Sequence, residues 1–130
     1  MDHNKSRKLI LAVDDEPGIL RIISASLRVY GYDVVTSCGG KEALELVESE
    51  KPDLILLDVL MPEMDGFETL EKLRVYSKLP VVVFSAHISS RDQALQLGAN
   101  DFLSKPFTPE QIEKKISAVL QLARNGGSNS

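Results

Sequence analysis

Leu54-Ile55-Leu56-Leu57-Asp58 is the stretch that decides the fold, because four apolar residues are followed directly by an acid. An apolar run without polar alternation is typical of a strand buried on both faces, as in a parallel sheet covered by helices on each side. Two further runs have this pattern, Leu9-Ile10-Leu11-Ala12-Val13 and Val81-Val82-Val83-Phe84. Residues 34–37 and 102–103 are weaker and shorter, as edge strands tend to be. The sequence therefore predicts five strands.

Stretches with helical periodicity lie between the predicted strands. Gly31 and Gly98 suit the C-terminal ends of the first and fourth helices, and Thr108-Pro109-Glu110-Gln111 has the spacing of a capping box that starts the fifth. Alternation of strand and helix with right-handed crossovers predicts an α/β fold, a doubly wound (βα)₅ parallel five-stranded sheet. The expected strand order is that of flavodoxin-like folds, 2-1-3-4-5. The apolar residues that mark the helices lie in 19–30, 43–47, 67–73, 89–97 and 112–120.

Length and composition limit the classes of function. The chain has 130 residues, 43% of them hydrophobic, which suits one compact domain. There is no apolar run of about 18 residues, so we expect no membrane span. The single cysteine, Cys38, fits a reducing cytosol and is expected to be buried or half-buried, so we expect a cytoplasmic protein. The net charge of −4 with scattered basic residues predicts no direct nucleic-acid contact.

The predicted domain covers residues 8–123. Residues 1–7 are polar and basic without the apolar core of a signal peptide, so we expect a polar N-terminal tail. Residues 124–130 are rich in Gly, Ser and Asn and are expected to form a flexible tail or the start of a linker.

Polar residues follow four of the predicted strands. Asp14 and Asp15 come after the first strand, Asp58 after the third, Ser85 at the end of the fourth, and Lys105 after the fifth. Ligands of open α/β sheets bind at the carboxyl ends of the strands, so these groups should converge. Clustered carboxylates repel one another and need a cation, and oxygen ligands with room for water favour Mg²⁺. A carboxylate nucleophile, a metal, a lysine and a hydroxyl together indicate phosphoryl transfer.

Each of these residues also has a simpler interpretation. Asp14 and Asp15 could cap the first helix, Asp58 could be a turn residue before Met61-Pro62, and Ser85 could cap the next segment. Lys105 on its own would be a solvated surface lysine. Their joint placement at one edge of the sheet favours a common site.

Four segments of the chain resemble the response-regulator receiver family. They are Val13-Asp14-Asp15-Glu16, residues 57–66 (LDVLMPEMDG), Phe84-Ser85-Ala86 and residues 101–107 (DFLSKPF). The four motifs occur in the family's order, and the resemblance covers about residues 8–123.

The resemblance implies a role for each site residue. Asp58 would accept a phosphoryl group from a phosphohistidine. Asp15 would bind Mg²⁺ directly and Asp14 would assist, often through water, with the backbone carbonyl of Leu60 completing the protein ligands. Lys105 would pair with Asp58 and then with the phosphoryl oxygens, and the family implies a cis peptide before Pro106. The chain would catalyse its own phosphoryl transfer and slow autodephosphorylation without being an ordinary enzyme.

The resemblance also implies a switch and partners. Ser85 would move to bind the phosphoryl group and Phe102 would turn inward, which would alter the face made by the last strand and the last two helices. The partners would be a sensor histidine kinase or histidine phosphotransfer protein and an output domain or protein. A homodimer on phosphorylation is compatible with Arg91, Asp101 and Lys115, which resemble part of the charge ladder used by winged-helix regulators.

Three other functions remain to be weighed. A flavodoxin would need a first loop rich in Ser, Thr and Gly to bind the FMN phosphate, and here that loop is acidic. An aspartyl-phosphate phosphatase usually carries a second aspartate two positions after its nucleophile, where this chain has Leu60. A receiver-like module that is never phosphorylated tends to lose the acids or the lysine, and this chain keeps them all.

Overall fold

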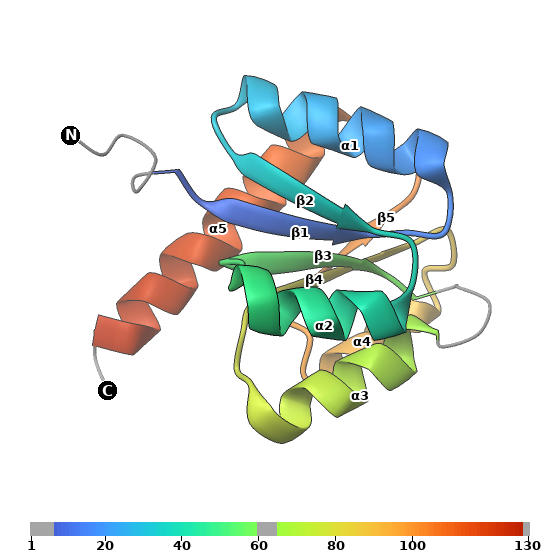
Figure 1. Cartoon of the computed structure of the whole chain (residues 1–130). Helices are drawn as coiled ribbons and strands as arrows, with labels where there is room; N and C mark the ends of the chain where they lie inside the picture. The colour runs from blue at the N-terminus through green and yellow to red at the C-terminus, as the bar shows by residue number, and fades with distance from the viewer. Residues whose placement is uncertain (1–6, 60–64, 129–130) are drawn as a thin grey trace.

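The computed structural model describes residues 7–59 and 65–128, and these form alternating strands and helices (Figure 1). The strands are β1 (Leu9–Val13), β2 (Asp33–Ser37), β3 (Leu54–Asp58), β4 (Val81–Ser85) and β5 (Asp101–Ser104). The helices are α1 (Pro17–Val29), α2 (Gly40–Glu50), α3 (Gly66–Tyr76), α4 (Ser90–Gln96) and α5 (Pro109–Ser128).

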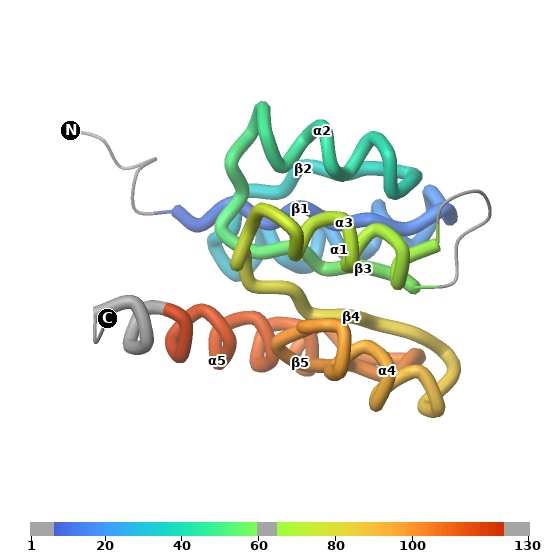
Figure 2. Tube along the Cα trace, turned by 90° about the horizontal axis from the view of Figure 1, so that it is seen from below, coloured from blue at the N-terminus to red at the C-terminus, as the bar shows by residue number. Residues whose placement is uncertain are grey.

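All strand pairs are parallel, and the sheet has the order β2-β1-β3-β4-β5. The strand labels of Figure 2 follow this order from top to bottom. The predicted fold class and strand order are therefore confirmed. The three continuous apolar runs became the central strands β1, β3 and β4, which are almost entirely buried, and the two weaker runs became the edge strands β2 and β5, which are only partly buried.

Two separate apolar clusters cover the two faces of the sheet. On one face, α1 and α5 pack against β1, β3 and β4 through residues such as Ile23 and Ile116. On the other, α2, α3 and α4 pack through residues such as Ala43, Leu70 and Ala94. Because both faces are buried, the open side of the sheet for chemistry is its carboxyl edge, where the arrows of Figure 1 end.

The helix ends follow the predicted signals, with one extension. Gly31 and Gly98 adopt the left-handed region, with φ of 95° and 105°. In the capping box, the Thr108 backbone N–H donates to Gln111 Oε1 at 2.8 Å, and the Gln111 N–H donates to Thr108 Oγ at 3.2 Å. Helix α5 then continues to Ser128, beyond the apolar residues 112–120 by which the sequence marked it.

Cys38 lies outside the core, contrary to the expectation of a buried or half-buried thiol. Its side chain is exposed in the turn between β2 and α2. Since β2 is an edge strand, no sheet neighbour lies beyond this turn among the described residues. In the described part of the chain, no helix combines the length and apolar character needed to cross a membrane.

Candidate functional site at the carboxyl edge

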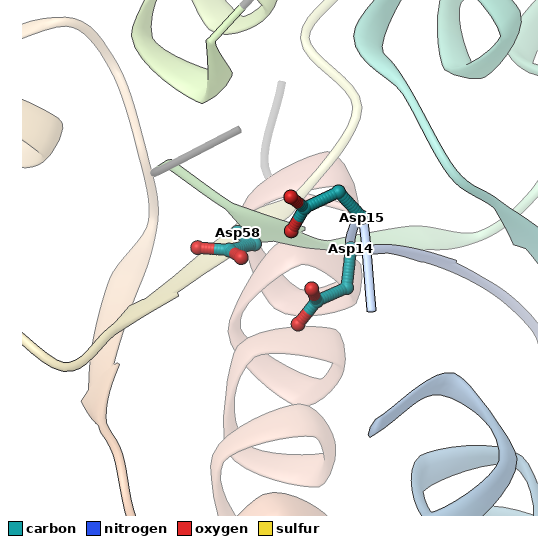
Figure 3. Close-up of side chains that lie close together, drawn as sticks. All are labelled: Asp14, Asp15 and Asp58. Atoms are coloured by element: carbon teal, nitrogen blue, oxygen red, sulfur yellow. The ribbon is translucent and has the colours of Figure 1, made fainter. Parts of the chain in front are cut away.

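Three carboxylates meet at the carboxyl ends of β1 and β3. Each of Asp14, Asp15 and Asp58 offers an oxygen, and these oxygens lie within 4.8 Å of one another. Figure 3 shows the three side chains close together, with those of Asp14 and Asp15 extending toward the side on which Asp58 lies. Asp14 and Asp58 are buried, with exposures of 0% and 3%, and Asp15 is the most open of the three. The sequence prediction that these acids converge is confirmed.

Backbone hydrogen bonds fix Asp14 at the end of β1. Its N–H donates to the carbonyl of Ser37 at 3.1 Å, which continues the β1–β2 ladder by one residue. Its Oδ1 accepts the N–H of Glu16 at 2.9 Å, which turns the chain toward α1. No side chain caps the start of α1, where Glu16 holds the cap position. Asp14 thus serves the turn and still directs its second oxygen into the site.

Asp58 ends β3 in register with Phe84 of β4. The chain then turns into α3, and the Gly66 N–H donates to the carbonyl of Val59 at 3.1 Å. Asp65 caps this helix by accepting the N–H of Glu68 at 2.8 Å. A side chain at position 66 would overlap the backbone of Asp58 and Val59, so glycine allows α3 to begin directly against the end of β3.

Lys105 reaches the same site from beyond β5. Its N–H donates to the Ser85 carbonyl at 2.8 Å, and the Lys105-Pro106 peptide is cis, as the family resemblance implied. Its Nζ lies 3.2 Å from Asp14 Oδ2 and 3.4 Å from Asp58 Oδ2. Burial lowers the pKa of Lys105, but the charges of Asp58 and Asp14 outweigh burial, so the pKa is raised. The side chain therefore stays an ammonium at neutral pH.

Ser85 and Phe102 lie on neighbouring strands, but the structure places them differently with respect to the site. Ser85 is fully buried at the end of β4, and its Oγ accepts the N–H of His87 at 3.0 Å. Phe102 of β5 is 5% exposed and belongs to the core cluster that includes Val83 and Ala94. The aromatic side chain thus points inward in this structure. The Leu60 carbonyl, expected near the acids, lies outside the described residues.

Sequence reasoning gave no role to the side chain of Phe84, which it had placed in a buried strand and in the Phe84-Ser85-Ala86 segment of the family resemblance. The Lys105 Nζ lies 4.8 Å from the centroid of the Phe84 ring. The one signal in the sequence was an aromatic residue immediately before Ser85 in the strand beside β3. That signal does not show on which side of β4 the Lys105 side chain lies. Only the folded structure shows this.

The composition of the site fits a hard divalent cation. Its described donors are carboxylate oxygens, the ligand type that Mg²⁺ prefers, and two of the three acids share one lysine. A single ammonium leaves an excess of negative charge among the three carboxylates. The donor set therefore accommodates Mg²⁺.

Comparison with known proteins agrees with this geometry. The model of the family described as "Response regulator receiver domain" matches residues 10–117. Proteins of this family use Mg²⁺ and interact with histidine kinases and output domains.

Two curated relatives are transcriptional regulators. "Probable transcriptional regulator ycf27" of Porphyridium aerugineum is 38% identical over 126 residues, which are 95% of this chain and 52% of that protein. "Alkaline phosphatase synthesis transcriptional regulatory protein PhoP" of Bacillus subtilis is 41% identical over 117 residues, which are 88% of this chain and 49% of that protein. The chain spans about half the length of these relatives.

A solved structure of similar size gives the same result. The chemotaxis protein CheY4 of Vibrio cholerae superposes with a TM-score of 0.82 at 33% identity, covering 87% of this chain and 98% of that one. The residues matched by the family model, 10–117, include all five strands apart from Leu9 at the start of β1, and they include Asp14, Asp15 and Asp58. The chain therefore belongs to the response regulator receiver domain family, as its acidic sheet edge and strand order had indicated.

Proposed function

We propose that this chain is a phosphorylation-dependent signalling switch in which Asp58 accepts a phosphoryl group. One observation carries the proposal: a buried carboxylate at the end of the central strand β3 lies beside two further acids and 3.4 Å from a lysine ammonium. Family membership supports it, because phosphorylation-dependent switching is a general property of receiver domains.

The chemistry is an in-line transfer to a carboxylate. An Asp58 oxygen forms a bond to phosphorus while the bond from phosphorus to the donor atom breaks. With acetyl phosphate the donor atom is oxygen and acetate leaves; with a phosphohistidine it is nitrogen, which then takes a proton from solvent. Lys105 keeps its protons and pairs with the phosphoryl oxygens, and positioning and charge neutralisation supply most of the catalysis.

Asp15, Asp14 and Asp58 would hold Mg²⁺, together with the Leu60 carbonyl. Mg²⁺ at this position supplies neutralisation of the carboxylates and of the incoming phosphoryl oxygens. The chain has leucine at position 60, where aspartyl-phosphate phosphatases carry their second aspartate. Hydrolysis of the Asp58 phosphoryl group is therefore slow, and the chain acts as a switch.

Ser85 and Phe102 transmit the change. The phosphoryl group offers charged acceptors near Ser85, whose hydroxyl rearranges to donate to them. Phe102 already points into the core in this structure. The rearrangement of the Ser85 hydroxyl is therefore coupled to the packing of the core around Phe102. The affected surface comprises α4, β5 and α5, where Lys115 Nζ contacts Asp101 Oδ1 at 3.1 Å.

The partners follow from this arrangement. A sensor histidine kinase or histidine phosphotransfer protein supplies the phosphoryl group, and an output domain or protein reads the α4, β5 and α5 surface. A homodimer formed through that surface on phosphorylation would use Arg91, Asp101 and Lys115. Asp101 and Lys115 pair within the chain, so dimer formation requires them to share or exchange partners.

Intact-mass measurement after incubation with acetyl phosphate and Mg²⁺ tests the phosphoacceptor. We expect one added phosphoryl group, and none in Asp58→Asn. Asp92→Asn, which removes an exposed acid of α4, is the matched control and should be labelled like the parent. Full labelling of Asp58→Asn would move the acceptor to another residue.

The switch is tested separately by NMR of α4 and β5 with and without beryllofluoride, a phosphoryl mimic. Ser85→Ala should bind the mimic at Asp58 but show smaller shifts over α4 and β5 than the parent. Equal NMR shifts over α4 and β5 in the parent and in Ser85→Ala would show that Ser85 does not transmit the change from Asp58 to this surface.

A further inference from the structure

Within residues 7–59 and 65–128, three groups lie next to the Lys105 ammonium, and two of them are carboxylates. Asp14 Oδ2 lies at 3.2 Å and Asp58 Oδ2 at 3.4 Å. The third partner is the ring of Phe84, with its centroid 4.8 Å from Nζ. An ammonium at this distance over an aromatic face is attracted by the negative charge of the π system.

The Phe84 ring is held in one orientation by its surroundings. Phe84 is fully buried in the core between the sheet and α1 and α5. Phe107 packs against it edge to face, with centroids 5.7 Å apart and an interplanar angle of 76°. Aromatic pairs favour this T-shaped arrangement. A ring fixed in this way presents one face in a constant position to the Lys105 ammonium.

An aromatic ring suits this site better than a fourth acid would. It attracts the ammonium without adding a formal negative charge, and three carboxylates are already gathered there. A further carboxylate would repel both its neighbours and an incoming phosphoryl group. The ring is also a constant partner. When Asp58 becomes an acyl phosphate, the lysine exchanges a carboxylate oxygen for phosphoryl oxygens, whereas its contact with Phe84 need not change.

We propose that Phe84 is a positioning residue whose ring holds the Lys105 ammonium between Asp14 and Asp58, in place to receive the phosphoryl oxygens. The inference rests on the proposed phosphorylation of Asp58 and deepens it. Lysine side chains have many rotamers, and a group that already points at the reacting atoms loses less freedom in the transition state. Phe84 therefore acts on the rate of transfer through Lys105, and Phe107 orients Phe84.

Fluorination of the Phe84 ring separates its electrostatic from its space-filling role. Phenylalanine with one, two or three fluorines is introduced at position 84 by amber suppression, which weakens the π face stepwise at nearly constant volume. The rate of Asp58 labelling by acetyl phosphate with Mg²⁺ is measured at saturating and at low concentrations of acetyl phosphate. The labelling rate should fall with each fluorine, by about threefold to tenfold over the series, the range expected of an exposed to partly buried cation–π contact.

The same series at Phe67 of α3, which packs in the cluster on the opposite face of the sheet, is the matched control and should leave the rate unchanged. Phe84→Leu should be slowed to a similar extent as the trifluorinated protein. If Phe84→Leu is slow while all fluorinated proteins react like the parent, the ring serves only to fill space and the proposal is wrong. Equal rates throughout would also contradict it.

A second measurement does not depend on phosphorylation. The ε-methylene protons of Lys105, assigned by their loss in Lys105→Arg, should be shifted upfield by the ring current of Phe84. This shift should disappear in Phe84→Leu and decrease along the fluorine series as the ammonium leaves the ring. If the parent is not labelled at Asp58, the proposed function fails, while the methylene shifts still decide whether Phe84 holds Lys105. Unshifted signals in the parent would overturn the inference.

Discussion

At the amino edge of the sheet, polar side chains bind the backbone of the strands, whereas at the carboxyl edge acidic side chains also face one another. At the amino edge, Asp53 Oδ2 accepts the N–H of Leu9 and Asn100 Oδ1 accepts the N–H of Val81, each at 2.8 Å. At the carboxyl edge, Asp14, Asp15 and Asp58 gather with one lysine. At the amino edge, polar side chains thus satisfy backbone hydrogen-bond donors of the sheet. At the carboxyl edge, aspartates are held close together although their charges repel one another.

This difference indicates where stability and function are concentrated. A hydrogen bond to a buried backbone donor stabilises the fold in every state of the protein. A cluster of like charges disfavours the fold unless cations, such as the Lys105 ammonium or a bound metal ion, compensate it. Neutralising an acid at the carboxyl edge and removing a backbone acceptor at the amino edge should therefore have opposite effects on stability.

The largest effect should come from Gly66→Ala, at the close backbone contact between the start of α3 and the end of β3. The added Cβ would overlap the backbone of Asp58 and Val59. The start of α3 must then move away from the end of β3, at a cost of roughly 3 kcal/mol. Urea unfolding should show this loss, and labelling of Asp58 should fall with it. Gly39→Ala, where an added Cβ meets nothing within 4 Å, is the control. Parent-like stability in Gly66→Ala would show that α3 can shift without cost.

Asn100→Ala should weaken the amino edge by about 1–3 kcal/mol, because the fully buried Val81 loses the acceptor for its N–H. The Arg74 guanidinium also loses its 3.2 Å contact with Asn100 Oδ1, although its hydrogen bonds to the Gly98 carbonyl remain. Labelling of Asp58 should be unchanged. Asn100→Asp, which keeps an accepting oxygen beside both donors, should retain most of the stability. Chemical denaturation of the three proteins checks this, and an equal loss in Asn100→Asp would contradict the argument.

Asp15→Asn should have the opposite sign. Neutralising this acid relieves repulsion with Asp14 and Asp58, whose Oδ2 atoms both contact Lys105. Without Mg²⁺ the melting temperature should rise by about 2–5 °C. Mg²⁺ binding, measured by titration calorimetry, should weaken. Glu45→Gln, an exposed acid of α2, is the control and should change neither quantity. A lower melting temperature for Asp15→Asn in the absence of Mg²⁺ would show that the Asp15 carboxylate stabilises the fold more than its repulsion with Asp14 and Asp58 destabilises it.

Much of the fold could be predicted because local signals agree with it. Continuous apolar runs specify strands buried on both faces, and Gly31, Gly98 and the Thr108 capping box mark helix ends by backbone conformation and hydrogen bonding. The convergence of the acids followed from topology alone, since residues that end neighbouring parallel strands share one edge.

Contacts that depend on side-chain direction across the fold could not be predicted. The position of Phe84 beneath Lys105 and the hydrogen bonds of Arg74 to Gly98 join residues that sequence spacing does not relate. The exposure of Cys38 depends on which strand forms the edge and on how the following turn leaves it.

The effect that should be smallest near neutral pH, and appear only at alkaline pH, lies in the contact between Tyr32 and α5. The Tyr32 hydroxyl donates to Glu113 Oε2 at 3.2 Å. Burial, followed by the charge of Glu113 and this hydrogen bond, raises the pKa of Tyr32 from 10.0 to about 12. A raised pKa means that folding favours the neutral phenol. This contribution is complete below about pH 10, where the phenol is neutral in both states, and is lost as the pH rises toward about 12. Between these values the unfolded chain releases a proton that the folded chain keeps, so stability falls with pH.

Tyr32→Phe should lose this part of the pH dependence, and urea midpoints measured from about pH 9 to about pH 12 should therefore decline less steeply than in the parent. Tyr30→Phe, an exposed tyrosine at the end of α1, should keep the parent's slope. An equal slope in the parent and in Tyr32→Phe would show that burial and the Glu113 contact do not favour the neutral phenol in the folded protein.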